Sequence, residues 1–135
     1  MNKILIVEDD QILLSMYQHL FTTHGYQVKV ARDGESGLEQ ALSEHPDLIL
    51  LDLNLPKLDG ITVMHRLRTD TWGKNASIII LTNLDTDEQR LAAVTTDQPA
   101  YYLVKANTSP EEVLEKVKEV LNSQAKALAD DNHLN

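Results

Sequence analysis

Two uninterrupted apolar runs in this chain end directly in carboxylates. The run Ile-Leu-Ile-Val near the start is followed by Glu8, Asp9 and Asp10, and a later run, Leu-Ile-Leu-Leu, is followed by Asp52. Apolar runs without polar alternation are typical of strands buried on both faces of a parallel sheet. A carboxylate that follows such a strand lies at the carboxyl edge of the sheet, where open α/β folds bind their ligands.

Five short apolar runs alternate with segments that have the 3.6-residue period of amphipathic helices. The clearest helix start is Ser109, an N-cap residue followed by Pro110 at the first helical position and Glu112 at the third. A less hydrophobic helix is expected at about residues 86–96. The strand candidates are Lys3–Val7, Gln27–Ala31, Asp47–Leu51, Ser77–Leu81 and Ala100–Val104.

Strict alternation of strands and helices predicts an α/β fold with a parallel sheet and helices on both faces. Five strands of this length fit the flavodoxin-like (βα)5 arrangement, with strand order 2-1-3-4-5. In that order the ends of the first and third strands are neighbours. The topology therefore predicts that Glu8, Asp9 and Asp52 meet in one crevice.

Composition restricts what the chain can be. Its 135 residues are enough for one domain with a full core, and its net charge of −9 argues against nucleic acid and against anionic membranes as partners. The absence of cysteine excludes disulfides, thiolate metal sites and cysteine nucleophiles. No basic segment followed by an apolar stretch opens the chain, and no apolar run approaches about 18 residues. We therefore expect a soluble, cytoplasmic protein.

The crowded carboxylates need a counter-charge. At separations of ~5 Å and an effective dielectric constant of about 20, each pair would repel by roughly 3 kcal/mol, unless a cation is held there or a carboxyl group is protonated. The fourth strand ends in Thr82 and the fifth in Lys105. We expect the crevice to contain acids, one hydroxyl and one ammonium group.

With these residues in place, the chain resembles the receiver domain of two-component response regulators over about residues 2–122. The resemblance divides the chain into a receiver domain, residues 1–122, and a polar tail, residues 123–135, that extends the last helix and then frays. It rests on four motifs in matching order, namely Glu8-Asp9-Asp10, Asp52-Leu-Asn-Leu-Pro56-Lys-Leu-Asp59-Gly60, Leu81-Thr82 and Tyr102-Leu-Val-Lys105.

The resemblance implies a phosphoacceptor and a metal. Asp52 would accept a phosphoryl group, and Mg²⁺ would be held directly by Asp9 and through water by Glu8. Asp52 itself and the backbone carbonyl of Asn54 would complete the protein ligands. Mg²⁺ prefers oxygen ligands of this kind and bridges carboxylate to phosphate, so the donor set fits the expectation.

The resemblance also implies a switch. Thr82 and Lys105 would contact the phosphoryl oxygens, and Tyr102 would change rotamer on activation. We expect the surface of residues ~84–121 to be the readout. The implied partners are a histidine kinase or His-containing phosphotransfer protein upstream and a protein target downstream, with the chain a monomer or weak dimer. It would be no enzyme beyond its own phosphorylation and dephosphorylation.

Three positions depart from the family pattern. Ala106 stands where the family usually has a proline joined by a cis bond. Either the loop keeps a cis bond here under strain, or Lys105 approaches the acids from a different loop conformation. Asn83 replaces a very small residue, and it could narrow access to the phosphoacceptor or hydrogen-bond to the phosphoryl group. Before the switch tyrosine, Gln98-Pro99-Ala100-Tyr101 replaces Gly-Ala-Asp-Asp, so the fourth helix must end differently.

Other functions remain open from the sequence. The first is a pseudo-receiver that binds proteins without phosphorylation, which Asn83 and Ala106 favour and the intact acids oppose. Another is a Mg²⁺-dependent phosphohydrolase, but such enzymes usually carry a second acid where this chain has Asn54. Flavin binding is opposed by the lack of a Ser/Thr/Gly-rich phosphate loop after the first strand.

Overall fold

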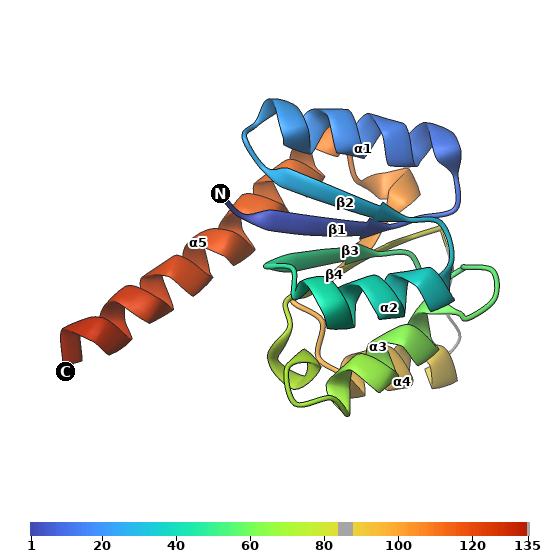
Figure 1. Cartoon of the computed structure of the whole chain (residues 1–135). Helices are drawn as coiled ribbons and strands as arrows, with labels where there is room; N and C mark the ends of the chain where they lie inside the picture. Colours follow the sequence, from blue (N-terminus) through green and yellow to red (C-terminus); the bar gives the residue numbers. More distant parts are fainter. Residues whose placement is uncertain (84–87, 135) are drawn as a thin grey trace.

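The computed structural model describes residues 1–83 and 88–134, which form a three-layer α/β fold (Figure 1). At its centre is a parallel five-stranded sheet with the order β2-β1-β3-β4-β5. This confirms the predicted flavodoxin-like topology. The strands are β1 (Lys3–Val7), β2 (Gln27–Ala31), β3 (Leu48–Leu51), β4 (Ile78–Thr82) and β5 (Tyr101–Val104).

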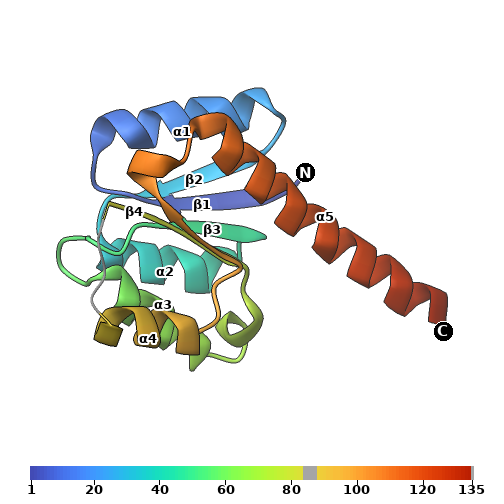
Figure 2. The ribbon, with the colours of Figure 1, turned by 180° about the vertical axis from the view of Figure 1, so that it is seen from behind.

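Helices cover both faces of the sheet. The helix pair α1 and α5 lies on one face, and α2, α3 and α4 lie on the other, as the two opposite views show (Figures 1 and 2). The helices are α1 (Gln11–Thr23), α2 (Gly34–Glu44), α3 (Gly60–Arg68), α4 (Glu88–Thr96) and α5 (Pro110–Leu134), with two short 3₁₀ turns, η1 (Gly73–Asn75) and η2 (Lys105–Asn107).

Two hydrophobic cores sandwich the sheet, because successive side chains of a strand point to opposite faces. In β1, Ile4 and Ile6 pack into the core beneath α1 and α5, whereas Leu5 and Val7 pack into the core beneath α2 and α3. All four side chains are almost fully buried. This burial on both faces is the reason for the uninterrupted apolar runs.

Three helices begin at aspartates in loops at the carboxyl edge of the sheet. Asp10, Asp33 and Asp59 are the N-caps of α1, α2 and α3, and each side chain accepts a backbone N–H from the first turn. These caps fix the direction in which the chain leaves each strand. The expected start of the fourth helix lies partly in residues 84–87, outside the described residues.

The strand ends differ slightly from the sequence prediction. The strands β3 and β5 each begin one residue later than predicted, and β4 is displaced by one residue and includes Thr82. Asp47 lies outside β3, and its carboxylate accepts the backbone N–H of Lys3 at 2.7 Å. The backbone N–H of Asp47 also donates to the carbonyl of Lys3 at 2.8 Å, so the pairing with β1 begins one residue before β3.

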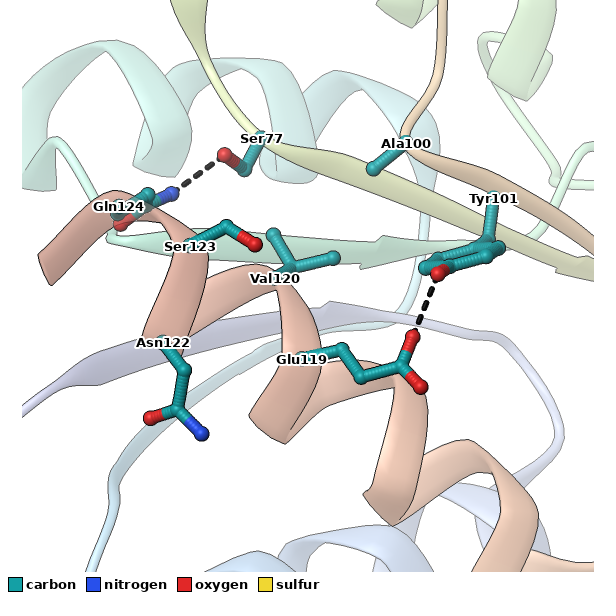
Figure 3. Close-up of a pocket in the computed structure, with 8 residues that line it drawn as sticks. All are labelled: Ser77, Ala100, Tyr101, Glu119, Val120, Asn122, Ser123 and Gln124. Carbon is teal, nitrogen blue, oxygen red and sulfur yellow. Dashed lines mark hydrogen bonds between the residues drawn. The ribbon is translucent and has the colours of Figure 1, made fainter. Parts of the chain in front are cut away.

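Helix α5 continues beyond the sheet and projects from the body of the molecule (Figure 1). Near the middle of the helix, the side-chain amide of Gln124 donates to the hydroxyl of Ser77 at the amino edge of the sheet (Figure 3). It also donates to the carbonyl of Asp47 at 3.0 Å. In the described part of the chain no helix, α5 included, is both long and apolar enough to cross a membrane. The division of the chain at residue 122 and the fraying of its end stay predictions.

Candidate functional site

The parallel register brings two acidic residues together at the carboxyl edge. Val7 pairs with Leu51, so that Glu8 and Asp52 leave neighbouring strands at the same level. The Asp52 N–H donates to the carbonyl of Val7 at 3.1 Å, and the Glu8 N–H donates to that of Ala31 at 3.0 Å. The hydrogen bonding of the sheet therefore continues one residue beyond β1 and β3, and it fixes the backbone of both acids.

Lys105 lies between these two carboxylates. It follows β5, and its Nζ is 2.6 Å from Oε1 of Glu8 and 3.0 Å from Oδ2 of Asp52. All three side chains are nearly buried, at 12% exposure for Lys105, 7% for Glu8 and 5% for Asp52. An ammonium group at this depth offsets much of the repulsion between the acids.

The remaining carboxylate oxygens of this pair are bound to backbone. Oε2 of Glu8 accepts the N–H of Asp10 at 3.0 Å, and Oδ1 of Asp52 accepts the N–H of Asn54 at 3.2 Å. Each buried acid is therefore held by Lys105 on one oxygen and by a nearby amide on the other. This arrangement gives every oxygen of both carboxylates a hydrogen-bond partner within the protein.

Asp9 completes a group of three acids. Its side chain is exposed, and one carboxylate oxygen from each of Glu8, Asp9 and Asp52 lies within 4.8 Å of the other two. Three carboxylates and the single ammonium of Lys105 carry a net charge of −2 when all are ionised. A compact set of oxygen donors with this charge suits a hard divalent cation such as Mg²⁺.

Burial and mutual contact shift the protonation of these groups. Burial raises the pKa of Glu8 above its ordinary value; the hydrogen bond from Lys105 opposes this shift, and the charge of Asp52 adds to it. Burial by itself would lower the pKa of Lys105, but its hydrogen bonds to Glu8 and Asp52 raise it overall. Lys105 is therefore a stable cation at neutral pH.

The other predicted site residues lie around this centre. Thr82 is fully buried at the end of β4, in register with Val104 just before the lysine, and the side chain of Asn54 is exposed on the loop after Asp52. Tyr102 is half-buried and packs on the core beneath α2 and α3. Three roles stay predictions, namely that of Thr82 toward the phosphoryl group, that of the Asn54 carbonyl toward Mg²⁺ and that of Tyr102 as the switch residue.

Ala106, which replaces the usual proline of the family, does not force a cis peptide bond after Lys105. The peptide bond between Lys105 and Ala106 is trans, like every other peptide bond of the described residues. It belongs to the 3₁₀ turn η2, which starts at the lysine itself. Lys105 therefore reaches the acids without the cis bond that is usual in the family.

Sequence reasoning gave no role at the site to two residues that lie beside it. Tyr17 of α1 packs beneath Glu8 and Asp52, where it helps to close a cavity of about 10 Å³, and burial raises its pKa. Arg32 follows β2 and donates from Nη2 to the carbonyl of Asp9 at 3.4 Å. Tyr17 falls on the 3.6-residue period of an amphipathic helix, a pattern that indicates only packing in the core, whereas Arg32 could have been noticed because it comes directly after a strand.

A doubly wound α/β fold with acids at the ends of its first and third strands and a lysine after its fifth defines the receiver class of signalling domains. The family model of the response regulator receiver domain matches residues 4–118. The chain therefore belongs to the response regulator receiver domain family of two-component systems.

Curated relatives of the chain are response regulators. It is 37% identical over 119 residues to the alkaline phosphatase synthesis transcriptional regulatory protein PhoP of Bacillus subtilis, covering 88% of this chain and 48% of PhoP. It is 31% identical over 118 residues to the probable transcriptional regulatory protein TcrX of Mycobacterium tuberculosis, covering 87% and 49%. The chain spans about half the length of these relatives.

Solved structures agree on the fold. A CheY-like response regulator receiver domain protein from Methanospirillum hungatei superposes with a TM-score of 0.86 at 26% identity, covering 94% of this chain and 98% of that one. The BeF3-activated N-terminal receiver domain of Klebsiella pneumoniae RstA gives a TM-score of 0.77 at 32% identity, covering 89% and 98%.

Proposed function

We propose that the chain is a phosphorylation-activated signalling switch in which Asp52 accepts a phosphoryl group. The donor would be a phosphohistidine on a histidine kinase or on a His-containing phosphotransfer protein. The observation that carries the proposal is the placement of Lys105 against Glu8 and Asp52, with Asp9 close enough to share an ion with both acids.

The proposed reaction needs positioning and charge neutralisation more than acid–base chemistry. An ionised oxygen of Asp52 attacks the phosphorus as the bond from phosphorus to the imidazole nitrogen breaks. The bonding pair stays on that nitrogen, which then takes up a proton. The chain needs no general base, since its nucleophile is already an anion, and the ammonium group of Lys105 balances charge on the phosphoryl oxygens.

Mg²⁺ is the proposed cofactor, and the residues present fit it. Glu8, Asp9, Asp52 and the backbone carbonyl of Asn54 would hold it. When bound, Mg²⁺ would neutralise the negative charge that the carboxylates and the incoming phosphoryl group bring together there. Three acids facing a single ammonium leave room for two further positive charges, which supports a divalent ion over a monovalent one.

The switch would act through the groups that surround the new phosphoryl dianion. Hydrogen bonds to charged groups contribute about 1.5–3 kcal/mol each. Inverting a population from 1:99 to 99:1 needs roughly 5.5 kcal/mol, so contacts from Thr82 and Lys105 are of the right size. We propose that they reposition α4 and β5, with residues ~84–121 as the surface that binds a downstream protein.

The proposed setting of the switch is the cytoplasm. We propose neither a nucleic acid nor a membrane as a partner of this chain, because its net charge of −9 would repel both. It would act as a monomer or weak dimer and catalyse only its own phosphorylation and dephosphorylation.

Acetyl phosphate tests this proposal without a cognate kinase. Incubated with Mg²⁺ and acetyl phosphate, the wild-type chain should gain the mass of one phosphoryl group, and Asp52→Asn should gain none. Asp59→Asn is the matched control, because Asp59 lies on the same loop but caps α3, a role that asparagine also fills. If the wild type stays unmodified, the phosphorylation-independent binding module becomes the better account.

A further inference from the structure

Arg32 stands at the rim of the acidic centre without a role in the proposed reaction. It is the first residue after β2, and the carbonyl of Ala31 before it accepts the N–H of Glu8. The Arg32 side chain is exposed and bends toward the loop after β1, where Nη2 donates to the carbonyl of Asp9 at 3.4 Å. A guanidinium group is thus placed against the backbone of the residue that supplies one of the three clustered acids.

The turn after β2, which contains Arg32, contacts the loop that follows Asp52. The N–H of Gly34 donates to the carbonyl of Pro56 at 3.2 Å, and the carboxylate of Asp33 lies 3.8 Å from Nζ of Lys57. The turn after β2 thus contacts the loop of Asp52 through Asp33 and Gly34, and the loop of Asp9 through the Arg32 side chain.

The charges around Arg32 leave its guanidinium open to an anion from outside. Lys57, the other cation of this rim, is already paired with Asp33. Within the described residues no carboxylate lies within 4.0 Å of the Arg32 guanidinium, and its one hydrogen bond goes to a neutral carbonyl. A guanidinium carries five N–H donors in a fork that matches phosphate oxygens.

We infer that Arg32 binds the phosphoryl oxygens of the incoming phosphodonor and so acts as a second cationic side chain in the reaction, beside the buried Lys105 and the proposed Mg²⁺. The inference rests on the proposed phosphorylation of Asp52. Lys105 is occupied by Glu8 and Asp52 before the donor arrives, whereas Arg32 is exposed and meets the anion first. Its contribution is to donor binding, so it changes the donor concentration needed for half-maximal rate more than the maximal rate.

A purely structural role for Arg32 makes a different prediction. If the guanidinium served only to fix the Asp9 loop through its carbonyl, removing it would weaken Mg²⁺ binding and leave donor binding unchanged at saturating Mg²⁺. Measuring both quantities on the same variants therefore separates the two roles.

The experiment compares Arg32→Met, Arg32→Lys and Arg66→Met with the wild type. Arg66 is an exposed arginine on α3, so Arg66→Met removes the same charge elsewhere on the surface. Phosphorylation is followed by intact mass over a series of acetyl phosphate concentrations and again with phosphoramidate, at saturating Mg²⁺. Mg²⁺ affinity is measured separately by titration calorimetry.

We expect Arg32→Met to raise the half-maximal concentration of both donors about three- to tenfold, with Arg32→Lys intermediate and Arg66→Met unchanged. Unchanged donor dependence in Arg32→Met would overturn the inference, as would a loss confined to Mg²⁺ affinity. An effect on acetyl phosphate alone would also overturn it, because the two donors share only the phosphoryl group. Failure of the wild type to be phosphorylated by either donor would instead refute the proposed function on which the inference rests.

Discussion

At the scale of single residues, Lys105 explains how two acids can be buried side by side. Its ammonium group contacts both Glu8 and Asp52, and each acid has a backbone amide on its other oxygen. Removing one partner of a buried ionic group leaves the others uncompensated, and this loss is larger than the net contribution of the intact group. The lysine is therefore required for stability as well as for the proposed chemistry.

Replacing Lys105 by methionine should lower the free energy of unfolding by about 3 kcal/mol at pH 7, because two buried carboxylates lose their counter-charge. The deficit should shrink on acidification, because burial raises the pKa of Glu8 and this carboxyl group takes up a proton sooner than an ordinary glutamate. Urea unfolding measures the change, with Lys118→Met as the control for an exposed lysine on α5. Equal losses in both variants would show that Lys105 does not stabilise the acids.

The raised pKa of Glu8 predicts how Mg²⁺ binding depends on pH. Burial lifts this pKa above the ordinary value of 4.5, so a protonated Glu8 contributes stability below pH 4.5 that is lost as the pH rises through the raised pKa. Mg²⁺ needs the ionised form. The increase in melting temperature caused by Mg²⁺ should therefore be lost at a higher pH than it would be if Glu8 had an ordinary pKa.

The comparison variant for this pH dependence is Glu8→Gln, which has no proton to exchange at that position. Its Mg²⁺-induced shift in melting temperature should be smaller at neutral pH and should change less between neutral and mildly acidic conditions. If wild type and variant lose the Mg²⁺ effect over the same pH range, Glu8 is not the group that competes with the ion.

At the scale of elements, Arg68 joins the end of α3 to the connection between α4 and β5. Its guanidinium donates to the carbonyls of Asp97 at 2.7 Å and Gln98 at 3.2 Å, and to those of Gly73 and Ala76 at 2.8 Å. Gln98 has a φ of 52°, in the left-handed region that favours glycine. This is the stretch in which the chain departs from the family pattern, and Arg68 holds it in place.

Substituting Arg68 by methionine should lower the free energy of unfolding by about 2–4 kcal/mol, since four carbonyls lose a charged donor. Arg66→Met, on the exposed face of the same helix, should change it by less than about 0.5 kcal/mol. Urea unfolding of both variants makes the comparison. A loss of similar size in the two would mean that the carbonyl contacts contribute little.

The elements themselves were largely predictable from the chain. Continuous apolar runs such as the one before Asp52 indicate strands buried on both faces, and five such strands alternating with helices fit the order that the sheet has. Once that order is known, the meeting of Glu8 and Asp52 follows from topology. Lys105 was expected in the same crevice because it follows the fifth strand, but its contact with both acids depends on a loop that apolar periodicity does not describe.

Contacts between side chains and distant backbone were not predictable. Arg68 binds a carbonyl 29 residues away in the sequence, and no local pattern of residue types records such a partner. The same holds for Arg32 and the carbonyl of Asp9. The trans bond after Lys105 also required coordinates, because the substitution of Ala106 for proline left two conformations open.

At the scale of the whole molecule, the two edges of the sheet differ in character. The carboxyl edge gathers the acids and Lys105, whereas the amino edge is where α5 is fastened by Gln124 to the starts of β3 and β4. Beside that contact lies an open groove of about 820 Å³ between β5 and α5, crossed by the hydrogen bond from Tyr101 to Glu119 (Figure 3). The proposed chemistry thus takes place at the edge opposite to the projecting helix.

The most direct test of the central claim is to locate the phosphoryl group. After treatment with Mg²⁺ and acetyl phosphate, reduction with borohydride converts an aspartyl phosphate to homoserine, which peptide mass spectrometry can assign to a position. We expect homoserine at position 52 and at no other aspartate, and none when Mg²⁺ is omitted. Homoserine at Asp9 or Asp59, or its absence from position 52 in a phosphorylated chain, would contradict the account.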